Sequence, residues 1–315
     1  MQPHAPFVSS STWDPGPSAH ARVDRLIRQY RQIVVSHLAP LVRAHHPAML
    51  ASGTDEYRKM LELSAKMNVV GHACTEILGQ EYDDRRQRIG SLFGACCFLA
   101  DSFIDDFGEQ ATREYLERLD LLLAEGWFDL RTDRERLFFA ILSRLFAERD
   151  IFHPTVRQAI LQLYAAQKRD VDLRQARGSP RGALNRAQLN SLKRCARNRS
   201  GHAILVLTAF LLPDIPLAYF ALMFAAGALI MYIDDHGDCY SDLKDNRITF
   251  MNQVKHPERT LKSIFMTYIT QLARGLPRND GRNLLIAFLT RYYLTRVEKH
   301  QQQRTMGGSA WAVYE

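Results

Sequence analysis

Apolar residues recur at helical intervals along most of the chain. Residues 21–48 place Val23, Ile27 and Val34 on one side, as an amphipathic helix does, although Pro40 and Pro47 are expected to interrupt it. Similar patterns predict further helices over 55–80, 81–107, 110–124, 132–147, 154–175, 258–274 and 280–300. No sustained two-residue alternation or hairpin turn is evident in the sequence. The pattern therefore predicts an all-α fold of about ten helices in a single domain.

The ends of the chain have a different character from its centre. Residues 1–20 are rich in Pro, Ser, Gly and His, which predicts a disordered segment. Residues 301–315 show no clear pattern and are interpreted as a tail. The helical domain is expected over 21–300, and the hydrophobic share of 46% supports a substantial core.

Two apolar runs each lead into a stripe of acidic residues. Leu217–Ile233 is followed at helical spacing by Asp234, Asp238, Asp242 and Asp245. Leu92–Ala100 is followed in the same way by Asp101, Asp105 and Glu109. Like charges four residues apart repel one another on a helix, and a bound divalent cation relieves that repulsion. Several carboxylates on one face suit Mg²⁺, which prefers oxygen ligands.

The long apolar run, the net charge and the cysteines indicate where the protein is located and what it can bind. Leu217–Ile233, at 17 residues, reaches only the short limit of a membrane span, so we expect a buried central helix and no transmembrane segment. The net charge of +7 is compatible with an anionic substrate, a nucleic acid or a membrane surface. The five cysteines form no CxxC pair, and the N-terminus has no hydrophobic signal core, so reduced thiols and a cytoplasmic location are expected.

Several metal-dependent and nucleophilic classes lack their motifs here. No Glu-x-x-His pair of a di-iron bundle, no Walker phosphate loop and no Gly-x-Ser-x-Gly elbow occurs in the sequence. What remains is diphosphate chemistry with carboxylate-bound metal ions and no side-chain nucleophile.

The two stripes resemble the paired aspartate motifs of the class I isoprenoid synthases. ADSFIDD (Ala100–Asp106) is similar to the first motif of squalene and phytoene synthases, and DCYSDLKDNR (Asp238–Arg247) is similar to their second. The spacing of Asp234, Asp238 and Asp242 also resembles the metal triad of class I terpene cyclases. The resemblance implies a single-domain helical bundle around a central apolar cavity.

The resemblance also implies roles for individual residues. RNRSGHA (Arg197–Ala203) resembles the helix break with a neighbouring arginine that senses diphosphate in the cyclases. Three Mg²⁺ ions with bound diphosphate are expected, held by Asp101, Asp105, Asp106, Asp234, Asp238 and Asp242. The diphosphate would be gripped by Arg197, Arg199 and Arg247. The residues expected to carry catalysis are Asp101, Asp105, Asp238, Asp242 and Arg247.

The resemblance is compatible with two reactions and with a non-catalytic protein. Cyclisation of one C15 or C20 prenyl diphosphate is favoured, because Arg247 is followed by ITFMNQ without the proline usual in head-to-head synthases. Head-to-head coupling of the squalene or phytoene type is the alternative, and a non-catalytic assembly protein on the same fold is another. Basic residues between Arg174 and Arg199 could bind RNA, but no aromatic residue lies among them, so nucleic acid is not the expected partner. The expected partner is the prenyl diphosphate substrate, with a homodimer left open.

Overall fold

The protein is built from helices, as the sequence predicts. The structure is a computed structural model of the chain and describes residues 15–51, 55–105, 108–150, 153–175, 184–245 and 247–306. Within these ranges it contains no strand, two short 3₁₀ helices (Pro47–Leu50 and Met251–Gln253) and the α-helices α1 (Pro17–His45), α2 (Asp55–Ile77), α3 (Asp84–Asp105), α4 (Gly108–Glu125), α5 (Asp133–Glu148), α6 (Pro154–Gln175), α7 (Arg186–Leu211), α8 (Leu217–Gly237), α9 (Cys239–Lys244), α10 (Pro257–Gly275) and α11 (Asp280–Met306).

Local sequence explains where several of these helices begin. α1, α6 and α10 each start with a proline, whose fixed backbone angle suits the first helical position. Thr132 and Asn185 precede α5 and α7, and each forms a capping box with Glu135 and Gln188 respectively. These caps satisfy backbone N–H groups that have no partner within the helix.

The first helix continues through the proline that was expected to interrupt it. Pro40 lies inside α1, and the predicted interruption there is wrong. A proline inside a helix costs about 3 kcal/mol. Buried residues flank it on both sides, among them Val34, Leu38, Leu41 and Val42. Tertiary packing of this face therefore outweighs the local cost.

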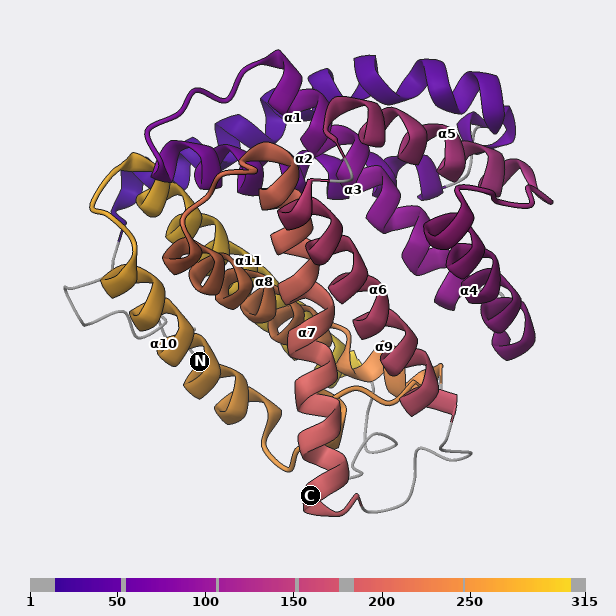
Figure 1. Cartoon of the computed structure of the whole chain (residues 1–315). Coiled ribbons are helices and arrows are strands. Elements are labelled where there is room, and N and C mark those ends of the chain that lie inside the picture. Colours follow the sequence, from indigo (N-terminus) through magenta and orange to yellow (C-terminus); the bar gives the residue numbers. More distant parts are fainter. Residues whose placement is uncertain are drawn as a thin grey trace.

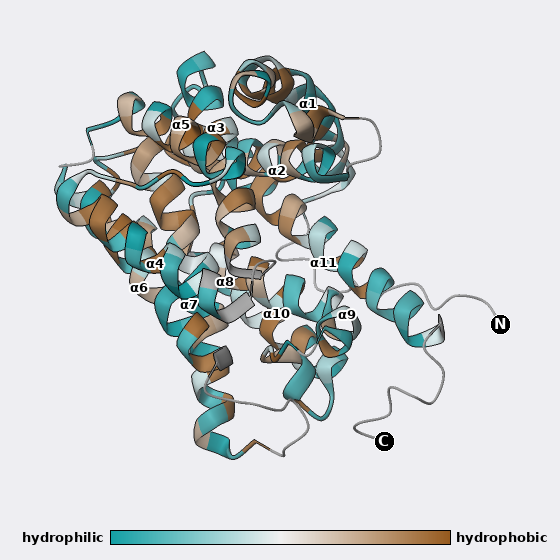
Figure 2. Ribbon diagram, turned by 90° about the vertical axis from the view of Figure 1, so that its right-hand side faces the viewer, coloured by the Kyte–Doolittle hydropathy of each residue, from teal (hydrophilic) through white to brown (hydrophobic). Residues whose placement is uncertain are grey.

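α8 is the helix on which α7, α10 and α11 pack. α2 and α3 form a closely packed pair that α11 joins to α8. Figure 1 shows α6 and α7 running side by side, with α1, α2, α3 and α5 forming a layer across one end. Figure 2 shows hydrophobic and hydrophilic residues alternating along the helices, as expected where each helix buries one face.

α8 is the apolar run that the sequence analysis weighed against a membrane span. Among the described helices it alone is long and apolar enough to cross a membrane, which is weak evidence because buried core helices have the same composition. Twelve of its residues are buried within the bundle, including the polar Asp235 and His236. The described part of the chain thus contains no clear transmembrane segment.

Two glycines let α7 and α8 approach closely. A Cβ atom at Gly227 would lie 2.3 Å from the backbone oxygen of Ser200, and one at Gly201 would lie 2.5 Å from the Phe224 ring. α7 runs without interruption past Gly201 to Leu211, so the predicted helix break in this segment is wrong. Gly201 is needed for the contact between helices and not for a change of direction.

The second acid stripe is not carried by one continuous helix. α8 ends at Gly237, and Asp238 has φ −103° and ψ 4° before α9 begins. Hydrogen bonds from Asp238 N to Asp234 O (3.0 Å) and from Asp242 N to Asp238 O (2.8 Å) keep the helical spacing across this bend. The predicted stripe is therefore bent at its second member, and Asp245 lies beyond the end of α9.

Candidate active site

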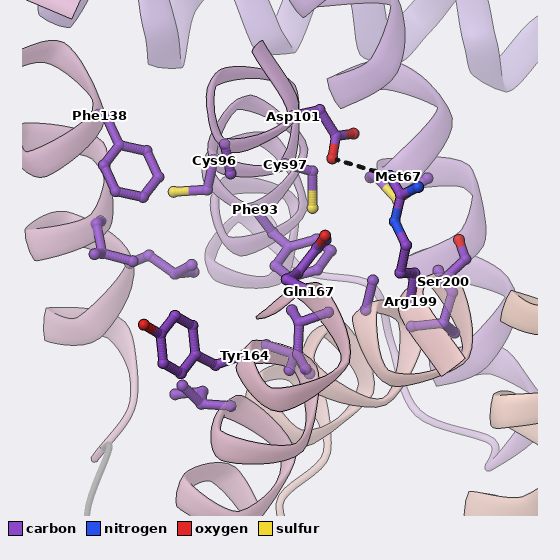
Figure 3. A pocket seen from close by; sticks show the side chains of 18 of the residues that line it. Met67, Phe93, Cys96, Cys97, Asp101, Phe138, Tyr164, Gln167, Arg199 and Ser200 are labelled. Atoms are coloured by element: carbon purple, nitrogen blue, oxygen red, sulfur yellow. Dashed lines mark ion pairs between the residues drawn. The ribbon is translucent and has the colours of Figure 1, made fainter. Parts of the chain in front are cut away.

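A largely apolar cavity of about 290 Å³ lies inside the bundle. Its walls are formed by residues of the helices from α2 to α8, together with α11. Leucine, phenylalanine and other apolar side chains make most of its wall, including Phe93 and Phe138. The charged side chains that line it, among the described residues, are Asp101, Arg199 and Asp234. In Figure 3, Asp101 and Arg199 face each other on one side, opposite Phe138 and Tyr164. The cavity thus has a polar side and an apolar side.

Arg199 connects three helices at this cavity. Its Nη2 atom lies 3.7 Å from Oδ1 of Asp101 on α3, and its Nη1 atom lies 3.1 Å from Oδ2 of Asp170 on α6. The side chain of Arg199 is only 11% exposed, and Asp170 is buried. A guanidinium with two carboxylate partners is well suited to exchange one of them for phosphate oxygens.

Side chains of α11 hold the carboxylates of α8. The Tyr292 hydroxyl donates to Asp234 Oδ1 at 2.5 Å, and the Arg296 guanidinium contacts the same oxygen. Asp238 contacts Lys299 and lies 3.5 Å from Nη1 of Arg296. Burial alone would lower the pKa of Arg296, but the charges of Asp234 and Asp238 outweigh it, and the pKa is raised.

Like Asp170, Asp235 is a buried acid of this region. Burial raises the pKa of its carboxyl well above the ordinary value, and the nearby charges of Asp242, Asp234 and Asp170 raise it further. Arg199 opposes this rise. Negative charge is therefore crowded around the C-terminal end of α8, in agreement with the repulsion expected from the sequence.

The structure separates the arginines that were expected to bind diphosphate. Arg199 reaches the cavity, whereas Arg197 is exposed elsewhere on α7, with its guanidinium 5.7 Å from the centroid of the Phe224 ring. Arg247 follows α9 and pairs with Asp245 at 3.4 Å. It is not among the residues that line the cavity.

Only some of the expected metal ligands lie at the cavity. Asp101 and Asp234 line the cavity, and Asp238 shares its cationic partner Arg296 with Asp234. Asp242 is half-buried on α9. The side chain of Asp105 and all of Asp106 lie outside the described residues, as does the side chain of Glu109.

The carboxylates do not converge on one point. In the part of the chain that the structure describes, no group of three or more His, Cys, Asp or Glu side chains is arranged to hold a metal ion. The donors are nevertheless hard oxygen ligands of the kind that Mg²⁺ takes together with substrate phosphates. Their chemistry fits a cation that arrives with a phosphate and is completed by its oxygens.

Some polar residues of the site were not found from the sequence. They are Asp170 on α6, Lys66 on α2, and Tyr292, Arg296 and Lys299 on α11. Tyr292, Arg296 and Lys299 are four and three residues apart, so they share one face of α11. That spacing was readable, but nothing local indicated that this face meets the acids of α8.

Among the described residues, two neutral side chains of the cavity wall have a buried polar atom without a hydrogen-bond partner. These atoms are the hydroxyl of Tyr115 and Oε1 of Gln167. Burial raises the pKa of Tyr115 far above its ordinary value, so the phenol keeps its proton. The cavity can therefore offer a hydrogen bond to a water molecule or to a polar group on a ligand.

Only some aromatic and sulfur-containing side chains of the bundle line the cavity. Phe93 lines it, whereas Phe98, Tyr219, Phe220 and Phe224 are not among its lining residues. All five cysteines are free, as predicted, and Cys96 and Cys97 lie in the cavity wall. Burial raises the pKa of Cys96, which makes it a poor nucleophile at neutral pH.

Comparison with known proteins adds no relative: no family model matches the chain, and no curated protein matches it.

Proposed function

We propose that the chain is a Mg²⁺-dependent class I terpene synthase, which ionises an allylic C15 or C20 prenyl diphosphate and cyclises the resulting carbocation. One observation carries the proposal. One acid of each stripe, Asp101 on α3 and Asp234 on α8, lines the same apolar cavity, together with Arg199. A ligand with an apolar chain and a charged head group matches such a cavity, because the chain fits the apolar wall and the head group fits the charged side.

Different residues would bind the diphosphate head group and the apolar tail of the substrate. Arg199, Arg296 and Lys299 would bind the diphosphate oxygens, and in the structure each of them contacts a carboxylate. Asp101, Asp234, Asp238 and Asp242 would hold Mg²⁺, with Asp105 and Asp106 of the first motif expected beside Asp101. Bound Mg²⁺ would supply Lewis-acid stabilisation of the leaving diphosphate.

The apolar wall would protect the carbocation. Exclusion of water prevents its premature capture. Phe93, Tyr115 and Phe138 line the cavity, and aromatic rings can stabilise positive charge through their π electrons. The unpartnered hydroxyl of Tyr115 would position a polar group, such as the water that ends a reaction as an alcohol.

Cavity size favours one substrate chain over two. Small-molecule pockets in proteins are about 300–1,000 Å³ in volume, and this cavity, at about 290 Å³, lies at the lower end. A head-to-head synthase must accommodate two prenyl chains. Cyclisation therefore stays the first proposal and coupling the second. Reduced thiols fit the cytoplasmic location that we propose with it.

The test is incubation with geranyl, farnesyl and geranylgeranyl diphosphates, followed by analysis of the released hydrocarbons and alcohols. We expect a product with the carbon number of the substrate, with Mg²⁺ required and EDTA abolishing diphosphate release. Asp101→Asn and Asp234→Asn should each lose most of the activity while the protein still unfolds cooperatively. Asp214→Asn, which removes an exposed acid from the α7–α8 loop, is the control and should be unaffected.

Other outcomes would assign other functions. A product with twice the carbon number of the substrate would replace cyclisation by head-to-head coupling. Turnover that persists in EDTA would contradict the mechanism. Failure to consume any prenyl diphosphate by a folded protein would favour the non-catalytic assembly protein.

A further inference from the structure

A second polar depression lies on the molecule away from the cavity. It has a volume of about 440 Å³ and is lined by residues of α7, α8 and α10. α7 and α10 both pack on α8 but make few contacts with each other. Figure 1 shows them on either side of α8. The depression is therefore a groove with α8 as its floor and α7 and α10 as its walls.

One wall of this groove is strongly basic. Lys193, Arg194 and Arg197 of α7 line it, and we call the site the basic groove. The residues are exposed, and none of them pairs with a carboxylate of the described residues. Some other exposed cations do pair, as Arg291 does with Asp24 and Lys168 with Asp120. Three like charges within five residues repel one another, and a bound anion would relieve this repulsion.

The opposite wall offers hydroxyl groups, and the floor is an aromatic side chain. Ser263, Thr267 and Tyr268 of α10 contribute hydroxyls, and Tyr232 of α8 forms the floor. The Tyr232 hydroxyl donates to the backbone oxygen of Lys193 at 2.9 Å. This bond fixes α7 on α8 at the level of the basic wall, so the cations are held on a rigid support.

The cations are also oriented by aromatic rings. The Lys193 Nζ atom lies 5.7 Å from the centroid of the Phe250 ring, and Phe250 packs edge-on against Tyr232. The Arg197 guanidinium lies at the same distance from the Phe224 ring. Contacts of this kind restrict long side chains without neutralising their charge.

We propose that the basic groove is a binding site for a phosphate-bearing anion, distinct from the cavity of the proposed synthase. Guanidinium groups suit phosphate oxygens because they donate two parallel hydrogen bonds, and a lysine adds a compact positive charge. The phosphate belongs either to a soluble phosphorylated molecule or to a lipid head group. The site does not depend on the proposed catalytic function, because it uses none of the motif carboxylates.

The experiment is calorimetric titration of the full chain with inorganic diphosphate in EDTA. Without a divalent cation, the carboxylates around Asp234 repel diphosphate, so the basic groove is tested alone. The variant Lys193→Gln/Arg194→Gln/Arg197→Gln should lower the affinity at least about tenfold, since charge-assisted hydrogen bonds are lost. The control Arg25→Gln/Arg28→Gln/Lys59→Gln removes the same charges from exposed positions on α1 and α2 and should bind as the wild type does.

Further arms identify the source of the phosphate. Flotation with phosphatidylcholine vesicles, with and without phosphatidic acid, tests for a lipid head group. Binding to phosphatidic acid that the groove variant loses assigns the site to lipid, and diphosphate binding without vesicle binding assigns it to a soluble ligand. Titration with added Mg²⁺ tests the cavity separately, and the groove variant should keep any Mg²⁺-dependent binding.

Three results would overturn the proposal. The first is a wild-type chain that binds neither diphosphate in EDTA nor phosphatidic acid. The second is an equal loss of affinity in the groove variant and the control, which would show general charge attraction only. The third is saturable binding of a polyribonucleotide without binding of diphosphate or lipid, which would make the groove part of a nucleic-acid surface.

Discussion

Arg197 and Arg199 are two residues apart on α7 and serve different parts of the molecule. A helix turns by about 100° per residue, so their side chains leave it on nearly opposite sides. Arg199 joins Asp101 and Asp170 at the cavity, and Arg197 lines the basic groove. The expectation that at least one of the pair binds substrate diphosphate thus rests on Arg199.

His236 gives the protein a pH-dependent stability. It is fully buried, and its ring stacks on that of His300 at 4.1 Å between centroids. Burial, together with the charge of His300, lowers the pKa of His236 to about 3. In the unfolded chain it titrates near the ordinary value of about 6.5. As the pH falls below that value, only the unfolded chain takes up the proton, so stability is lost progressively from about pH 6.5 to about pH 3.

His236→Phe should remove this contribution while keeping a ring in the stack. Between about pH 7.5 and about pH 4.5, the wild type should lose about 2–3 kcal/mol more unfolding free energy than the variant does. Urea unfolding at the two pH values measures the difference. His256→Gln, at an exposed histidine, is the control and should retain the wild-type slope. Equal slopes for wild type and His236→Phe would show that this histidine is not held neutral.

At the level of elements, the contact between α7 and α8 depends on the absence of a side chain. In Gly227→Ala the new Cβ atom would lie 2.3 Å from the Ser200 backbone oxygen and 2.9 Å from the Ile204 Cβ atom. Alanine favours a helix by about 1 kcal/mol over glycine, but a backbone carbonyl inside a helix cannot move aside. We expect a net loss of about 1–3 kcal/mol in the free energy of unfolding.

Gly201→Ala is the matched comparison for this variant. The three atoms nearest to its Cβ atom would all belong to the Phe224 ring, a side chain that can turn away, so the loss of stability should be smaller. Chemical denaturation of both variants decides between them. A Gly227→Ala protein as stable as the wild type would mean that α7 and α8 separate at little cost.

Helical periodicity was sufficient to predict most elements, and the bounds of α6 agree with the predicted 154–175. It failed where a distant part of the chain determines the local conformation. Pro40 stays inside α1 because of packing on the core, and Gly201 serves a helix contact that no local pattern reveals. The bend at Asp238 occurs where Gly237 makes room for the side chain of Arg296 from α11.

The site was predictable on one side only. Acidic stripes after apolar runs are visible in the sequence, and Asp101 and Asp234 were found in this way. Their cationic partners were largely missed, because Arg296 and Lys299 lie about sixty residues further along the chain. Only the folded bundle brings these charges together.

For the molecule as a whole, α11 supplies the positive charge that balances the acids of α8. Arg296→Gln/Lys299→Gln removes this balance and should lower the melting temperature in EDTA, because Asp234 and Asp238 then repel each other without compensation. Mg²⁺ should restore stability to this variant more than it stabilises the wild type, if the carboxylates bind the ion. Scanning calorimetry with and without Mg²⁺ makes the comparison, with Arg291→Gln on the same helix as the control. No additional Mg²⁺ effect in the double variant would argue against these acids as metal ligands.

The same pairing has a consequence for how the protein is made. Asp234 and Arg296 are 62 residues apart in the chain. At about 5–20 residues per second, a ribosome completes α8 roughly 3–12 s before it adds Arg296. Throughout that interval the most apolar helix of the described chain lacks α11 and the counter-charges that α11 supplies. A chaperone that recognises exposed apolar segments therefore meets α8 on the nascent chain, and translation speed between the two helices sets how long that encounter lasts.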